Sequence, residues 1–138
     1  AQPAVVSRGA RAQLELEVKL IELRAMQVLA ECASTGEQGL QMLVQKPYDL
    51  IFLDIVLPGA DGYEICKFIR RNHKTKHIAV IMLTSKSSPF DRIRGSLAGC
   101  NSYLTNPVEH AKFHAVVEKC VSETQKQHAT QHGATVMA

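Results

Sequence analysis

Four consecutive apolar residues run directly into a carboxylate in the segment Leu50-Ile51-Phe52-Leu53-Asp54. An uninterrupted apolar run of this kind is typical of a central parallel strand that helices cover on both faces. The pattern returns at residues 78–83, which run into Thr84. Because ligands bind beyond the carboxyl ends of the strands in open parallel α/β sheets, these two runs predict buried strands whose polar ends contribute to a functional site.

Shorter segments predict further strands. Val28, Ala30 and Cys32 alternate as in a strand, and Ser102–Thr105 predicts a last short strand. The segment 4–6 is compatible with a truncated first strand. Segments with helical periodicity separate the strands, so the order along the chain predicts an α/β fold with a parallel sheet.

Capping signals predict where the helices begin and end. Residues 34–37 and 61–64 resemble capping boxes, in which Ser34 and Asp61 would cap the helix and an acidic residue follows three positions later. Pro89 suits the first turn of another helix, Gly99 suits its carboxyl-terminal cap, and Pro47 stops the helix before it.

Apolar residues at helical spacing predict the inward faces of these helices. The five groups, in chain order, are Leu14, Val18 and Ile21; Leu40, Leu43 and Val44; Ile65, Phe68 and Ile69; Ile93 and Leu97; and Phe113, Val116, Val117, Cys120 and Val121. Residues 14–20 also alternate as in a strand, but the Leu, Glu, Lys and Arg content of residues 14–24 favours a helix.

Composition excludes several classes of protein. The 138 residues are 46% hydrophobic and 21% charged, which fits one folded domain and disfavours a disordered or collagen-like chain. No apolar run approaches the roughly 20 residues of a membrane span, and the amino end lacks the apolar core of a signal peptide. We therefore expect a cytoplasmic protein with no membrane association. The net charge of +3 is too small and dispersed to predict a nucleic-acid partner.

Cysteine and histidine residues do not predict a metal site. Cys32, Cys66, Cys100 and Cys120 form no CxxC pair, so they are expected to be reduced thiols. His110 and His114 have metal-compatible spacing, as do His128 and His132 if that segment is helical, but no third and fourth ligands accompany them.

An aspartate and a hydroxyl at neighbouring strand ends suit phosphoryl transfer. A carboxylate can act as the nucleophile that accepts the phosphoryl group, and a hydroxyl can donate a hydrogen bond to the new phosphate. The alternative is structural, in which Asp54 caps a loop and Thr84 satisfies a strand end. Spacing by itself leaves both interpretations open.

Three motifs resemble those of response-regulator receiver domains: DIVLPGADG at 54–62, MLTS at 82–85 and YLTNP at 103–107. Their order and spacing match that family over roughly residues 26–122. Residues 83–107, with DRIRG and LAG, are particularly similar to stand-alone receivers associated with chemotaxis and twitching motility. The resemblance implies a flavodoxin-like, doubly wound five-stranded parallel sheet in the order 2-1-3-4-5. It implies a receiver-like domain over residues 1–125, with a poor match at 1–25. The polar composition of residues 126–138 predicts a flexible tail after the domain.

The resemblance also implies roles for individual residues. Asp54 would be the phosphoacceptor, Thr84 would bind a phosphoryl oxygen, and Tyr103 would be the aromatic switch. Asn106 and Pro107 would line the pocket, with Pro107 after a peptide bond that is cis in the family. The signal would pass to the face formed by the last two strands and helices.

The acidic pair of the family is missing. Receivers carry two acidic residues at the end of the first strand, and these residues help the phosphoacceptor to hold Mg²⁺. Here the corresponding positions are Ser7-Arg8 or Gly9-Ala10, and the first acidic residue is Glu15. If Mg²⁺ binds, the ligands left to it are Asp54 and the Val56 carbonyl, so metal binding is expected to be weakened. Arg8 is alternatively a fixed cation at that place or a solvated surface residue.

The lysine of the terminal loop is also missing, because Asn106 occupies its position. Losing one preorganised donor typically slows a reaction by about 10²–10³-fold, so phosphotransfer to Asp54 is expected to be slow or absent. Lys86, close to Thr84 in sequence, is a candidate source of positive charge at the rim.

Two functional hypotheses follow. One is a signalling domain of a two-component phosphorelay, phosphorylated at Asp54 by a histidine kinase or phosphotransfer protein and acting on a downstream protein target. The other is a pseudo-receiver that binds a protein without phosphorylation. An enzyme or nucleotide binder is disfavoured because the chain has no GxGxxG motif, phosphate-binding glycine loop or nucleophile–base pair. A homodimer is compatible with either hypothesis, and the chain is either a single-domain regulator or part of a longer protein.

Overall fold

The computed structural model describes residues 4–7, 21–33, 35–57 and 60–137. Five parallel strands form its main sheet: β1 (Ala4–Ser7), β2 (Ala30–Ala33), β3 (Leu50–Leu53), β6 (Ala79–Thr84) and β7 (Ser102–Thr105). Their order is β2-β1-β3-β6-β7, which confirms the predicted 2-1-3-4-5 arrangement. A small antiparallel ladder that the sequence analysis did not predict joins β4 (Val56–Leu57) to β5 (Ala60–Asp61).

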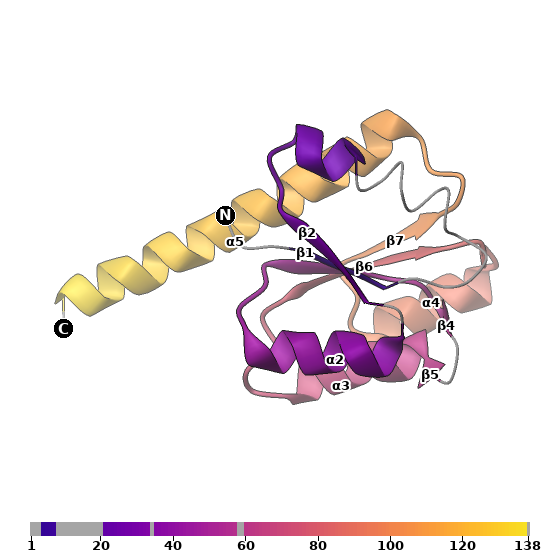
Figure 1. Ribbon diagram of the computed structural model, residues 1–138, viewed down its shortest axis with the longest axis horizontal. Helices are drawn as coiled ribbons and strands as arrows, with labels where there is room; N and C mark the ends of the chain where they lie inside the picture. Colours follow the sequence, from indigo (N-terminus) through magenta and orange to yellow (C-terminus); the bar gives the residue numbers. More distant parts are fainter. Residues whose placement is uncertain (1–3, 8–20, 34, 58–59, 138) are drawn as a thin grey trace.

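Helices cover both faces of the sheet (Figure 1). The helices α2 (Gly36–Gln45), α3 (Gly62–Arg71) and α4 (Pro89–Ala98) lie on one side, and α5 (His110–Met137) runs along the other. Residues 21–25 are also helical. No helix in the described part of the chain is long and apolar enough to cross a membrane.

Each central strand contributes to two cores. In β3, Ile51 and Leu53 pack with α2 and α3, whereas Leu50 and Phe52 pack with α5. The Phe52 ring stacks on Phe113 of α5, with 5.4 Å between the ring centroids. This two-sided burial is the physical reason why the strand is apolar at every position.

The predicted helix boundaries are mostly confirmed. Asp61 caps α3 by accepting a hydrogen bond from the Tyr63 amide, and Pro89 begins α4 after the N-cap Ser88. Gly99 ends α4 in the left-handed conformation with φ 101°. For α2 the prediction is off by one residue, because Thr35 rather than Ser34 accepts the hydrogen bond of the Gln38 amide. Ser34 itself lies outside the described residues.

Several apolar residues predicted to face inward are exposed instead: Ile21, Val44, Phe68, Ile93 and Leu97. In α2 and α3 the buried positions belong to neighbours such as Leu43 and Ile69. In α4 the prediction is wrong because Gly95 and Ala98 are the buried residues. Near residue 21 the buried side chain is Leu23. Helical periodicity identified the helices, but it assigned exposed residues at the edges to their buried faces.

The ends of the chain differ in how far the structure tests the predictions. The strand predicted at residues 4–6 is present as β1, whereas Leu14 and Val18 lie outside the described residues. The strand predicted from Val28 begins two residues later, at Ala30. Helix α5 buries Phe113, Val117 and Cys120 as predicted, and it continues through residues 126–137, the predicted polar tail. The flexibility of that segment stays a prediction.

All four cysteines are free thiols.

Candidate functional site at the carboxyl edge of the sheet

The candidate site residues follow the carboxyl ends of adjacent strands. Asp54 directly follows β3, Thr84 ends β6, and Asn106 directly follows β7. In the sheet, Leu53 pairs with Met82, and Thr84 pairs with Thr105. The structure therefore places Asp54, Thr84 and Asn106 at one edge of three neighbouring strands.

The loop after Asp54 is fixed by the first residue of α3. The Gly62 amide donates a hydrogen bond to the Ile55 carbonyl at 3.2 Å. A Cβ atom at Gly62 would lie only 2.6 Å from Ile55 Cα and 2.8 Å from the Asp54 carbonyl oxygen, so only glycine fits without a backbone shift. The sequence pair Asp61-Gly62 therefore brings the amino terminus of α3 against the backbone of Asp54.

Thr84 is almost completely buried at the end of β6, with 1% of its surface exposed. Its Oγ1 atom accepts a hydrogen bond from the Lys86 amide at 3.3 Å, which leaves the hydroxyl proton for another acceptor. Its carbonyl accepts a hydrogen bond from the Asn106 amide at 2.8 Å. The Asn106–Pro107 peptide bond is cis. Thr84 is therefore bonded to the loops that follow both β6 and β7.

Tyr103 of β7 contacts the same loop from the other side. Its hydroxyl donates to the Lys86 carbonyl at 2.8 Å, and its ring lies 5.4 Å from the Arg92 guanidinium carbon of α4. Burial and the neighbouring Tyr63 hydroxyl raise the pKa of the Tyr103 phenol, so this group stays a neutral donor. The backbone of Lys86 thus connects Thr84 to Tyr103, whereas the Lys86 side chain is exposed.

A polar network between α3 and α4 was not predicted as part of the site. The Tyr63 hydroxyl donates to the Asp91 carbonyl at 3.1 Å, and Arg94 lies over the Tyr63 ring with its guanidinium carbon 4.2 Å from the centroid. Arg94 also contacts the Asp61 carboxylate at 3.3 Å. The sequence signal was the DRIRG segment, whose Asp and second Arg are these two residues.

Within the ranges that the structure describes, the donors at this edge do not fit a magnesium ion; residues 8–10, the other candidate positions for the acidic pair, lie outside those ranges. Mg²⁺ is bound in proteins by carboxylates and other hard oxygen ligands in nearly octahedral geometry. Asp54 supplies one carboxylate, but Asp61 is held by the Tyr63 amide and Arg94, and β1 ends with Ser7. Among the described residues, no group of three or more His, Cys, Asp or Glu side chains is arranged to hold a metal ion.

The histidine pair of α5 has a different partner. The rings of His110 and His114 lie 4.4 Å apart between centroids, and His110 Nδ1 contacts Glu22 Oε1 at 3.0 Å. This contact connects the start of α5 with residues 21–25. The side chains of His128 and His132 lie outside the described part of the chain.

The family model of the response regulator receiver domain matches residues 10–118. The chain belongs to this family. Receiver domains are signalling modules of two-component systems, and they interact with histidine kinases and downstream targets. The match begins after β1, so it does not include Ser7, the last residue of that strand.

Curated relatives support this assignment. The receiver domain is 34% identical over 109 residues to the transcriptional regulatory protein AfsQ1 of Streptomyces coelicolor, covering 76% of this chain and 46% of that protein. It is 32% identical over 106 residues to the response regulator PleD of Caulobacter vibrioides, covering 75% of this chain and 23% of that protein. The chain thus spans less than half the length of these relatives.

Solved structures have the same fold. The receiver domain of the Francisella response regulator 1452 superposes with a TM-score of 0.80 at 21% identity, covering 90% of this chain and 99% of that one. A two-component response regulator from Clostridium difficile gives a TM-score of 0.79 at 21% identity, covering 88% of this chain and 97% of that one. These similarities confirm the predicted receiver fold.

Proposed function

We propose that this receiver domain accepts a phosphoryl group on Asp54 and transmits the change through Thr84, Lys86 and Tyr103. The observation that carries the proposal is the double use of the Lys86 backbone. Its amide donates to the Thr84 hydroxyl, and its carbonyl accepts from the Tyr103 hydroxyl. A movement of Thr84 toward a phosphate on Asp54 would therefore change the position of the group that holds Tyr103.

The phosphodonor is a histidine kinase or phosphotransfer protein. A carboxylate oxygen of Asp54 attacks the phosphorus of a phosphohistidine, the P–O bond forms, and the P–N bond breaks. The imidazole leaves with the electron pair and is then protonated. Phosphotransfer would take place in the cytoplasm, the location expected for a chain with no apolar span or signal-peptide core. The neutral Asn106 supplies less charge than the lysine of the family, and this loss alone should slow transfer by about 10²–10³-fold. The missing acidic pair weakens metal binding and should slow transfer further.

The output surface is the exposed side of α4 beside Tyr103. Phe90, Ile93 and Leu97 are 69%, 58% and 80% exposed, and their spacing places them along this helix. Isolated apolar side chains are common on surfaces, but a row of three large ones on a helix suits a partner. We propose that a downstream protein binds here, and a second copy of the domain is the alternative occupant.

A pseudo-receiver that binds its target without phosphate is the second candidate. Ser7 at the end of β1 and Asn106 after β7 favour it, because both positions lack the charges that support phosphate. In this case Asp54 would be structural, and Tyr103 would keep its bond to Lys86 in every state.

Mass spectrometry after incubation with Mg²⁺ and acetyl phosphate distinguishes the two candidates. The proposal expects a base-labile mass gain of one phosphoryl group that is absent in Asp54→Asn. An ordinary receiver treated in parallel shows that the conditions support labelling. If that control is labelled and this chain is not, even after long incubation, the phosphoacceptor proposal is wrong and the pseudo-receiver is supported. Beryllofluoride titration is a second check.

A further inference from the structure

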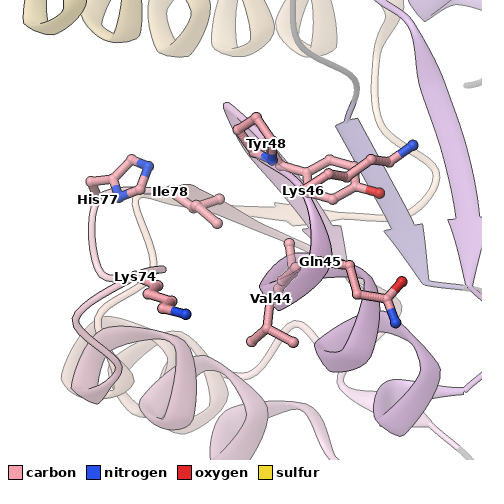
Figure 2. A pocket seen from close by; sticks show the side chains of 9 residues that line it. Val44, Gln45, Lys46, Tyr48, Lys74, His77 and Ile78 are labelled. Atoms are coloured by element: carbon pink, nitrogen blue, oxygen red, sulfur yellow. The ribbon is translucent and has the colours of Figure 1, made fainter.

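A cavity of about 270 Å³ opens at the amino edge of the sheet, the edge opposite the one at which Asp54 follows β3. Figure 2 shows the side chains that line it. It lies where α2 ends and where the chain enters β3 and β6. Nothing in the proposed phosphotransfer uses this edge. The lining residues are Leu43, Val44, Gln45, Lys46, Pro47, Tyr48, Lys74, His77 and Ile78.

One wall of the cavity is held in place by a buried tyrosine. Tyr48 is 1% exposed, and its hydroxyl donates to Glu31 Oε2 of β2 at 2.9 Å. Lys46 Nζ forms an ion pair with the other oxygen of Glu31. The hydrogen bonds from Lys46 and Tyr48 lower the pKa of the Glu31 carboxyl, so Glu31 stays charged and holds both side chains. The cavity is therefore bordered by a fixed aromatic ring, and the Lys46 charge is already balanced.

The other side of the cavity is cationic. Residues 70–77 include four Lys or Arg and two His but no acidic residue. Arg70 is bonded to the Ile78 carbonyl at 2.6 Å and the Gly99 carbonyl at 2.8 Å, which fixes the loop. Lys74 and His77 are exposed and line the cavity, and both are labelled in Figure 2.

The positive charge exceeds what the neighbouring helix ends require. The carboxyl ends of α2 and α3 each carry about half a negative charge from the helix dipole. Even if Lys74 offsets the charge at the end of α3, two further charges remain close by: that of Arg71, the last residue of α3, and that of Lys76 on the loop after it. A negatively charged partner is therefore favoured at this edge.

We propose that this edge binds an acidic segment of a partner protein that places one large apolar or aromatic side chain in the cavity. The space is below the usual range for a drug-sized ligand but suits a single anchoring side chain between Val44, Tyr48 and Ile78. Carboxylates on either side of the anchor would lie opposite Lys74 and His77. A nucleic-acid backbone would use the charges but not the apolar walls, so the protein partner is favoured. Because Asp54 lies at the opposite edge, both edges can be occupied at once.

The test uses the ¹⁵N-labelled full chain and the synthetic peptide acetyl-Glu-Asp-Phe-Glu-Asp-amide in an NMR titration. We expect saturable shifts in the amides of residues 43–48 and 74–78. The peptide with Gly in place of Phe should bind at least about fivefold more weakly, and the peptide with Lys in place of its acidic residues should not bind. Shifts elsewhere, or equal binding of the Phe and Gly peptides, would overturn the proposal.

Matched variants separate the cavity from general charge. Lys74→Glu should weaken binding of the peptide by about tenfold, and Val44→Asp should weaken it by a similar factor, since both residues line the cavity and are exposed. Lys76→Glu makes the same charge change on the same loop, but Lys76 does not line the cavity. This variant should weaken binding of the peptide by about threefold or less. Equal losses for Lys74→Glu and Lys76→Glu would refute the cavity site. A ten-nucleotide oligothymidylate is titrated in the same way. If it shifts the same amides and binds more tightly than the peptide, the partner is a nucleic acid and the proposed protein partner is wrong.

Discussion

Helices α3 and α4 have the same length, ten residues, but they are attached to the sheet in different ways. Helix α3 buries large side chains, among them Tyr63, Ile65 and Ile69. Helix α4 buries only Gly95 and Ala98 and exposes Ile93 and Leu97.

Helix α4 has no large buried apolar face, and polar contacts hold it on the sheet instead. Its N-cap Ser88 exchanges hydrogen bonds with Asp91, and Arg92 and Arg94 lie over the rings of Tyr103 and Tyr63. Cation–π and capping contacts are each typically worth about 1 kcal/mol, whereas one buried large side chain contributes about 1.5–3 kcal/mol. Helix α4 is therefore held on the sheet less strongly than α3, and it lies against Tyr103, the proposed switch residue.

The largest expected effect is on the core of α3. Ile69→Ala removes a fully buried side chain and should lower the free energy of unfolding by about 2–5 kcal/mol. Ile93→Ala, the same substitution on the exposed side of α4, should change it by no more than about 0.5 kcal/mol. Urea unfolding followed by circular dichroism measures both. A loss above about 2 kcal/mol for Ile93→Ala would show that α4 is held by its apolar residues after all.

The second effect concerns the close packing of α4 on β7. A Cβ atom at Gly95 would lie 2.7 Å from Tyr103 Cδ2, so Gly95→Ala forces the ring to move. We expect a net loss of about 1–2 kcal/mol, because the strain exceeds the gain of about 1 kcal/mol in helix propensity. The NMR signals of the Tyr103 ring should shift. Ser96→Ala, at an exposed position of the same helix, is the control, and increased stability of Gly95→Ala would contradict the close contact.

The smallest effect is that of the α4 cap. Ser88→Ala removes the hydrogen bond to the Asp91 amide and should cost about 1 kcal/mol at neutral pH. The Ser88 hydroxyl also donates to the Asp91 carboxylate, and this bond lowers the pKa of Asp91. A lowered pKa contributes stability that is present above the ordinary aspartate value and is lost as the pH falls through the lowered one.

The difference in stability between the wild type and Ser88→Ala should therefore shrink at low pH. Ser87→Ala, at the exposed neighbouring position, is the control and should have little effect at any pH. Thermal unfolding between pH 7 and pH 3 measures this difference, and a constant difference would exclude the contribution of Asp91.

The sequence predicted the two central strands well because each of them combines a continuous apolar run with a polar end. The runs before Asp54 and Thr84 became β3 and β6, and the resemblance to receivers supplied the strand order. The inward faces were predicted less well, since a helical period does not say how much of the helix the sheet covers. Val44 and Phe68 lie at the edges of such faces and are half-exposed.

The candidate site was predicted in part. The positions of Asp54, Thr84 and Asn106 at one edge follow from their places after parallel strands, whereas their roles stay predictions. The contacts of Tyr63 and Arg94 were missed. The DRIRG segment stood out in the sequence, but nothing in it shows that its second Arg meets a tyrosine of α3.

The sequence by itself determined which chemical groups follow the strands: an aspartate at 54, a hydroxyl at 84, an asparagine at 106 and no carboxylate among the first fourteen residues. Tertiary structure decided that Lys86 connects Thr84 to Tyr103 and that Lys74 and Tyr48 border one cavity. The reason is physical. The type of a side chain is written at one position, but a contact between distant segments depends on strand register and on how closely the backbones pack.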